Sequence, residues 1–211
     1  MPTDKDWTGN AHSTFSMLGA SNHSEYVREE HDYYATEPAA VDSLLKQTPI
    51  AIDTKITKIW EPACGAGNLS EEMKKLGYDV LSTDMYDHGY GETGEQYDFL
   101  YAKELPEGVN AIITNPPYKY AYEFCEKCVE LGVDTFAMLL KTTFLEGKKR
   151  RKFYDKYPPK YVCVFTNRIS CARNNDFEQF KVNSAACYSW FIWEKGFTGR
   201  PQIIWITKED N

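Results

Sequence analysis

Short apolar segments that alternate between the periods of strands and helices constrain the fold of this chain most strongly. Strands that alternate with helices form a mostly parallel sheet with helices on both faces. The last two apolar segments flank Gly196-Phe197-Thr198-Gly199, which predicts a closing antiparallel hairpin at an edge of the sheet. The pattern predicts strands over 56–60, 80–83, 111–114, 135–140, 161–166, 188–193 and 203–206. It predicts one helix that begins at Thr36-Glu37-Pro38 and three further helices over 69–76, 120–131 and 148–157.

The length of the chain indicates one domain. Its 211 residues suffice for one core but not for a second domain of full size. Residues 1–30 are polar and aperiodic, so we expect a flexible arm followed by a single domain over 31–211. No apolar run approaches the roughly 18 residues of a membrane helix, and Met1-Pro2-Thr3-Asp4-Lys5-Asp6 lacks the order of a secretory signal. We therefore expect a cytosolic protein with no membrane partner and six reduced cysteines.

The charge of the chain is negative but unevenly distributed. A formal charge of −7 argues mildly against a polyanionic partner, because nucleic-acid-binding domains usually carry a basic surface. Residues 145–160 hold seven basic and two acidic side chains, which gives +5 and leaves −12 on the rest. This segment predicts either a cationic patch or an ordinary solvated helix face.

A glycine-containing loop, Glu61-Pro62-Ala63-Cys64-Gly65-Ala66-Gly67, follows the first predicted strand and opens the next helix. Its glycines allow a sharp turn and a close approach of the backbone to a ligand. Glu61 and Asp84 each follow a predicted strand and lie 23 residues apart, close to the spacing of a carboxylate that binds ribose hydroxyls. Ser70 stands where a dinucleotide-binding loop has its third glycine, and an acid before the loop favours a cationic ligand over a pyrophosphate. The loop therefore predicts a site for S-adenosylmethionine (SAM), which has a ribose and a sulfonium but no phosphate, or else a tight turn in a packed core.

A rigid turn, Asn115-Pro116-Pro117-Tyr118, follows the strand predicted over 111–114. Ligands of open α/β sheets bind beyond the carboxyl ends of the strands, so we expect this turn beside the glycine loop. The side-chain oxygen of Asn115 and a backbone carbonyl can accept both hydrogens of a planar amino group, which polarises the amine without a strong base. Tyr118 can stack on the ring that bears the amine, if the base lies outside a duplex stack.

The two motifs together resemble those of SAM-dependent amino-methyltransferases, particularly adenine-specific DNA methyltransferases of phage and prophage type. Tyr33-Tyr34-Ala35-Thr36-Glu37-Pro38 resembles the N-terminal motif of this family, and its position before the glycine loop is similar to the gamma class. The match covers residues 33–145, and 189–196 is weakly similar to the closing hairpin of these enzymes. The resemblance implies a Rossmann-like class I fold with a seven-stranded sheet, SAM as cofactor, and methyl transfer to the 6-amino group of adenine in DNA. It implies as catalytic residues Asn115, Pro116, Pro117 and Tyr118.

The resemblance also implies cofactor and nucleic-acid contacts. In this family the N-terminal motif packs around the methionine end of SAM, and Asp98-Phe99 resembles the acidic-aromatic motif beside the cofactor adenine. The cofactor-binding residues expected are Tyr34, Thr36, Glu61, Pro62, Ala63, Cys64, Gly65, Gly67, Asp84, Met85, Asp98 and Phe99.

The chain departs from gamma-class restriction-modification enzymes, which carry a separate target-recognition domain for which there is no room here. Two segments remain that could contact DNA. They are the basic helix 148–152 and the polar segment 167–184, in which we expect no helix or strand. We therefore expect short or relaxed sequence specificity, with a target adenine that is flipped out or single-stranded. The nucleic-acid contacts expected are Lys148, Lys149, Arg150, Arg151, Arg168 and Arg173.

Other functions stay open at this point. The Asn-Pro-Pro-Tyr motif also serves RNA adenine methylation and glutamine methylation in release factors, and a silent SAM-binding or nucleic-acid-binding module is a further alternative. Release-factor enzymes carry an N-terminal helical domain, which residues 1–30 do not replace. Retention of Asn115 and both prolines argues against a silent module.

The remaining cysteines, tryptophans and histidines predict packing rather than chemistry. Cys125 and Cys128 have metal-ligand spacing but lie in a helix pattern without a second Cys/His pair, so we interpret them as thiols and expect no metal. Trp190 and Trp193 are interpreted as packing residues. None of the four histidines is assigned a role, and no obligate protein partner is evident.

Overall fold

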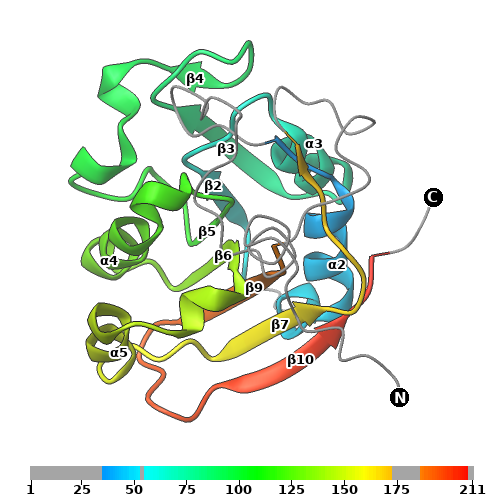
Figure 1. The fold of residues 1–211 in the computed structure, drawn as a ribbon. Helices are drawn as coiled ribbons and strands as arrows, with labels where there is room; N and C mark the ends of the chain where they lie inside the picture. Colours follow the sequence, from blue (N-terminus) through cyan, green and yellow to red (C-terminus); the bar gives the residue numbers. More distant parts are fainter. Residues whose placement is uncertain (1–34, 53–54, 173–185, 209–211) are drawn as a thin grey trace, which may run out of the picture.

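A mixed sheet of eight strands runs through the centre of the computed structural model, which describes residues 35–52, 55–172 and 186–208 (Figure 1). The order is β10-β7-β9-β6-β5-β2-β3-β4, and β9 alone among these strands runs against the rest. The predicted α/β class with a mostly parallel sheet is therefore confirmed. The strands are β2 (Lys58–Glu61), β3 (Asp79–Asp84), β4 (Glu92–Thr93), β5 (Ala111–Thr114), β6 (Thr135–Lys141), β7 (Tyr161–Phe165), β9 (Tyr188–Glu194) and β10 (Gln202–Ile206).

Helices cover both faces of the sheet, as predicted (Figure 1). Neighbouring residues of β5 show how the core divides, since Ile113 packs in one buried cluster and Ile112 in the other. Successive side chains of a strand point to opposite faces of the sheet, so one apolar strand contributes side chains to both buried clusters. The first cluster contains apolar residues of α2 (Ala39–Gln47) and α3 (Asn68–Lys75), and the second contains those of α4 (Ala121–Leu131) and α5 (Lys148–Tyr154).

The interpretation of the tryptophans and of two cysteines as packing residues is confirmed. Trp190 and Trp193 of β9 are buried, and their indole N–H groups donate to the carbonyls of Ala40 and Tyr157 at 2.8 and 3.0 Å. Cys125 and Cys128 are fully buried on the sheet-facing side of α4. Burial raises the pKa of both thiols, so they are uncharged core side chains.

The arrangement of strands differs from the prediction in two details. The additional strand β4 has two residues, too few to show a side-chain period. The closing strands β9 and β10 run in opposite directions, but β7 lies between them and hydrogen-bonds to both. The connection between them is longer than the roughly two to five residues of a direct hairpin loop, so it does not impose direct pairing.

A second, two-stranded sheet corrects the prediction for the polar segment 167–184. β1 (Ala35–Thr36) pairs antiparallel with β8 (Cys171–Ala172), and Thr36 lies opposite Cys171. The pairing is made by backbone groups and needs no apolar period, so the sequence pattern did not reveal it. Thr36 consequently belongs to a strand, and helix α2 begins at Ala39, after Pro38.

Some predictions lie outside the described residues, namely those for the arm 1–30, Tyr34 and Arg173. Within the described ranges, no helix combines the length and the apolar character needed to cross a membrane.

Candidate active site

A pocket lies where the carboxyl ends of β2, β3 and β5 meet at one edge of the sheet. The connection after β2 leads to α3 on one face and the connection after β5 leads to α4 on the other, so the two loops separate at this point. Open α/β sheets bind ligands at such a point. The pocket is lined by Ala35, Thr36, Glu61, Ala63, Cys64, Ala66, Asn68, Leu69, Asp84, Tyr86, His88, Asn115, Pro116, Pro117 and Tyr118.

Asp84 ties the glycine loop to the loop that follows β3. The N–H of Gly65 donates to Asp84 Oδ2 at 2.9 Å, and the N–H of Tyr86 donates to Asp84 Oδ1 at 2.9 Å. An ionised carboxylate has about four lone-pair sites, so each oxygen retains acceptor capacity after these bonds. Asp84 therefore shapes the pocket and can still accept hydrogen bonds from ligand hydroxyls.

Tyr90 packs the loop after β3 against the bend of the glycine loop. Gly67 has φ +82°, and a Cβ built on it would lie 2.5 Å from the Tyr90 ring, so only glycine fits there. The Tyr90 hydroxyl donates to Glu71 Oε1 at 2.5 Å and accepts from Lys74 Nζ at 2.6 Å. The loop is thus fastened to both the first and the last turn of α3, and it carries Tyr86 and His88 into the pocket wall.

Glu61 is a pocket carboxyl that is almost removed from water, with 1% of its surface exposed. Its pKa is raised from 4.5 to about 8, chiefly because burial desolvates the carboxyl; a hydrogen bond from Ser70 opposes this shift and the nearby charge of Asp84 adds to it. Among the described residues that line the pocket there is no Lys or Arg. The pocket therefore offers hydrogen-bond acceptors and carboxyl groups without an opposing Lys or Arg, which suits a cationic ligand without phosphates.

The Asn-Pro-Pro-Tyr turn forms the opposite side of the pocket. Asn115 Nδ2 donates to Thr36 Oγ1 at 2.8 Å, which fixes the plane of the carboxamide. The Pro117 carbonyl accepts from the N–H of Tyr120 at 2.8 Å, and neither proline has an N–H to donate. The Pro117 carbonyl is therefore already engaged within the turn.

Tyr118 is held by its neighbours at this corner. Its ring stacks on Tyr188 with centroids 5.8 Å apart and 29° between the planes, and Lys141 Nζ lies 5.3 Å from the ring centroid. Burial raises the pKa of the phenol well above its usual value, so the hydroxyl is neutral at physiological pH. Tyr188 and Lys141 therefore both lie against this ring.

Comparison with known proteins identifies the architecture. A search with the sequence finds no matching family model and no matching curated protein. The structure is similar to a crystal structure of a putative RNA methyltransferase, PH1948 from Pyrococcus horikoshii, with TM-score 0.59 and 15% identity over 85% of this chain and 95% of that chain. The chain has the class I methyltransferase fold. A dimethyladenosine transferase from Plasmodium falciparum is similar with TM-score 0.49 and 16% identity, over 76% of this chain and 62% of that chain.

In this methyltransferase fold, several expected cofactor residues lie outside the pocket lining. Pro62, Gly65 and Gly67 form the bend itself, and Met85 is partly exposed beyond Asp84. Asp98 lines a separate pocket beside β3 and β4. Phe99 is 2% exposed in the core, with its ring centroid 5.1 Å from that of Trp60 and 4.7 Å from that of Phe124.

The expected nucleic-acid contacts on α5 are exposed but partly engaged within the protein. Lys149 Nζ lies 3.0 Å from Glu123 Oε1 and 3.8 Å from the centroid of the Tyr122 ring. Arg151 Nε lies 2.8 Å from Asp155 Oδ1. Arg150 Nε donates to the Glu146 carbonyl, whereas no internal partner of Lys148 is found among the described residues. Arg168 lies apart from this helix, between β7 and β8, and donates to the Ala186 carbonyl at 3.1 Å.

Sequence reasoning missed several residues of the pocket wall. Tyr86 and His88 line the pocket from the loop after β3, and Asn68 and Leu69 line it from the start of α3. A signal for Tyr86 and His88 was present, because they follow Asp84 by two and four residues at the carboxyl end of a strand. Ala35 lines the pocket through the pairing of β1 with β8, for which the sequence carries no signal.

Proposed function

We propose that this chain transfers a methyl group from SAM to the 6-amino group of adenine in DNA. The observation that carries the proposal is that Asn115, both prolines and Tyr118 line the same pocket as the glycine loop, Glu61 and Asp84. Methyl transfer requires that the accepting amine and the cofactor share one site, because the amine nitrogen attacks within a few ångströms of the methyl carbon.

The residues of the pocket fit SAM. Asp84 has acceptor capacity for ribose hydroxyls, and the buried carboxyl of Glu61 favours a cation over a phosphate. When bound, SAM supplies a methyl group on a sulfonium, which is strongly electrophilic. A cationic ligand near Glu61 lowers the pKa of that carboxyl from about 8, so ligand binding and ionisation of Glu61 support each other.

The chain's own residues activate the amine by accepting hydrogen bonds. The Asn115 side-chain oxygen and the Pro116 carbonyl accept the two amine hydrogens, which draws the nitrogen lone pair out of conjugation with the ring. As the amine nitrogen bonded to the methyl carbon, the sulfur–carbon bond of the cofactor would break and leave a neutral thioether. The two acceptors would stabilise the positive charge that develops on the amine, and its extra proton would pass to solvent. Tyr118 remains protonated because of its raised pKa, so it contributes a ring face and does not act as a base.

The adenine of the substrate can belong to DNA or to RNA. The motif order of the gamma class supports DNA, and the exposed cations of α5 support a phosphate backbone partner. RNA adenine is the second candidate, and the similarity of the fold to a putative RNA methyltransferase favours it. We propose short or relaxed sequence specificity in either case.

Incubation with labelled SAM and DNA, RNA or release factor tests this proposal. We expect label in the adenine of DNA with the wild-type protein and none with Asn115→Ala, while SAM binding by Asn115→Ala is retained. Lys75→Ala, an exposed substitution on α3, is the matched control and should transfer as the wild type does. Label in RNA alone would select the second candidate, and label in protein alone, or in no polymer, would refute adenine methylation.

A further inference from the structure

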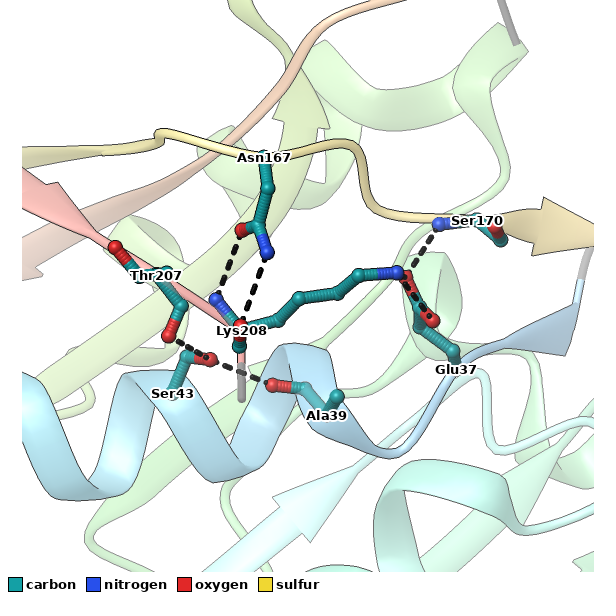
Figure 2. A network of polar contacts seen from close by, with 7 residues as sticks. All are labelled: Glu37, Ala39, Ser43, Asn167, Ser170, Thr207 and Lys208. Carbon is teal, nitrogen blue, oxygen red and sulfur yellow. Dashed lines mark hydrogen bonds and ion pairs between the residues drawn. The ribbon is translucent and has the colours of Figure 1, made fainter. Parts of the chain in front are cut away.

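We propose that Thr36 is a positioning residue for Asn115, and that a polar network around Glu37 and Lys208 holds Thr36 in place (Figure 2). The inference rests on the proposed function, because it assigns to Asn115 the role of accepting the target amine. It concerns the step at which the carboxamide must present its oxygen and not its nitrogen to the substrate.

A carboxamide has a donor end and an acceptor end, and a rotation of 180° exchanges them. Asn115 Nδ2 donates to Thr36 Oγ1 at 2.8 Å, so the oxygen lies on the side opposite Thr36. The rotated carboxamide would direct its oxygen at Thr36 and its NH2 group at an amine, which is a donor facing a donor. The Thr36 hydroxyl can itself donate or accept, and the Cys171 side chain, its hydrogen-bond partner, can take the hydroxyl proton. With that proton directed at Cys171, the Thr36 oxygen favours the orientation in which Asn115 Nδ2 donates to it and Asn115 Oδ1 is the acceptor.

Thr36 is placed by backbone pairing. It lies in β1 opposite Cys171 of β8 and is 3% exposed. The next residue continues the pairing, because the N–H of Glu37 donates to the Ser170 carbonyl at 3.2 Å. The position of the Thr36 hydroxyl therefore depends on how firmly β1 and β8 are joined.

The Glu37 side chain joins three distant segments of the chain (Figure 2). Its Oε1 accepts from the N–H of Ser170 at 2.6 Å, and both of its oxygens lie 3.1 Å from Lys208 Nζ. The backbone of Lys208 is held in turn by Asn167, whose Oδ1 accepts from the Lys208 N–H at 2.9 Å and whose Nδ2 donates to the Lys208 carbonyl at 3.0 Å. Segments before α2, between β7 and β8, and after β10 are thereby fixed to one another.

This ion pair differs from the exposed pairs elsewhere on the surface. The side chains of Lys208 and Glu37 are 20% and 18% exposed, whereas those of Arg151 and Asp155 are 78% and 54% exposed. A sheltered pair with several hydrogen bonds is screened less by salt than an exposed pair. Ser43 adds a contact to the same segment, because its hydroxyl lies 2.8 Å from the Ala39 carbonyl and 3.3 Å from the Thr207 carbonyl.

Steady-state kinetics of Thr36 and Glu37 variants test the proposal. Thr36→Val removes the hydroxyl at constant shape, and we expect kcat to fall about tenfold with the KM for SAM within about twofold of wild type. Thr36→Ser restores the hydroxyl and should restore kcat.

Glu37→Gln keeps the acceptor for Ser170 but removes the charge, and we expect a smaller loss of kcat, roughly threefold. Lys46→Met, which breaks an exposed pair with Asp42 on α2, is the control and should leave kcat unchanged.

A nuclear magnetic resonance measurement tests the same contact without any activity. The side-chain NH2 signals of Asn115, assigned by their loss in Asn115→Asp, should exchange with water faster in Thr36→Val than in the wild type and in Thr36→Ser. Unchanged exchange and unchanged kcat in Thr36→Val would overturn the proposal, and so would a raised KM for SAM with kcat unchanged, because Thr36 would then hold the cofactor. If the wild type transfers no methyl group, the proposed function fails, but the exchange rates still decide whether Thr36 orients Asn115.

Discussion

Glu61 and Asp84 line the same pocket but differ in burial and in hydrogen bonding. Each Asp84 oxygen accepts a hydrogen bond from a backbone N–H group at 2.9 Å. Glu61 is 1% exposed, and the Ser70 hydroxyl that donates to it offsets only part of the desolvation, so its pKa rises to about 8. Without a cationic ligand, Glu61 is therefore mostly protonated at neutral pH.

The raised pKa of Glu61 predicts a pH-dependent stability. Between about 4.5 and about 8 the folded protein keeps a proton that the unfolded chain has lost, so the free energy of unfolding falls as pH rises, by at most about 1.4 kcal/mol per pH unit. Glu61→Gln carries no titrating group there, so its stability relative to wild type should increase with pH. Urea unfolding of both proteins at pH 5, 6, 7 and 8 measures this, and parallel pH curves would contradict it.

Gly67 supplies a second prediction at the scale of one residue. Gly67→Ala combines a positive φ with a Cβ 2.5 Å from the Tyr90 ring, whereas Gly77→Ala has a similar φ of +93° and no neighbour within 4 Å. We expect Gly77→Ala to cost about 1 kcal/mol and Gly67→Ala to cost more, about 3 kcal/mol, because the ring must also move. Equal costs in denaturant titrations would show that Tyr90 does not pack on the loop.

Among the elements, helix α5 concentrates positive charge at the surface of an acidic protein. Its cations are not equivalent, because Lys149 and Arg151 have carboxylate partners within the chain at 3.0 and 2.8 Å. A phosphate would have to compete with these partners, so we expect each of the two to contribute less to DNA binding than Lys148.

Replacement of the four α5 cations, Lys148, Lys149, Arg150 and Arg151, by alanine should weaken DNA binding and lower its salt dependence. Each phosphate contact contributes about 0.9 to the slope of log K against log salt on duplex DNA, so we expect a loss of about 2 and not of about 4. The measurement is a fluorescence anisotropy titration at several salt concentrations. Alanines at four other exposed cations, Lys46, Lys75, Lys103 and Arg200, are the control of equal charge. Equal slopes for the two quadruple variants would exclude α5 as the phosphate-binding element.

Elements that bury an apolar face were predictable from the sequence, and elements that depend on backbone pairing were not. The apolar run 188–193 predicts β9, observed as Tyr188–Glu194, because its side chains fill the core. By contrast, β4 and β8 have two residues each, and the insertion of β7 between β9 and β10 leaves no trace in periodicity. The same division applies to the site. Asn115 and Asp84 follow apolar strands and were identified, whereas the bond from Asn115 to Thr36 needs the pairing of β1 with β8.

On the scale of the whole molecule, the sheet brings residues from distant parts of the chain to one edge. Thr36 and Asn115 are 79 positions apart and form one hydrogen bond, and Glu37 and Lys208 are 171 positions apart and form one ion pair. The acceptor turn is therefore connected, through Thr36 and Glu37, to the segment that follows the last strand. In the proposed function, this turn and the glycine loop form one site in which an amine and a methyl donor meet.

Nucleoside mass spectrometry of DNA and RNA from cells that express the protein is the decisive measurement of adenine methylation. We expect N6-methyl-2′-deoxyadenosine to accumulate in cells with the wild-type chain and to stay at background with Asn115→Ala expressed at the same level. Absence of N6-methylated adenine from both DNA and RNA, or equal amounts with the wild type and Asn115→Ala, would contradict the proposed function.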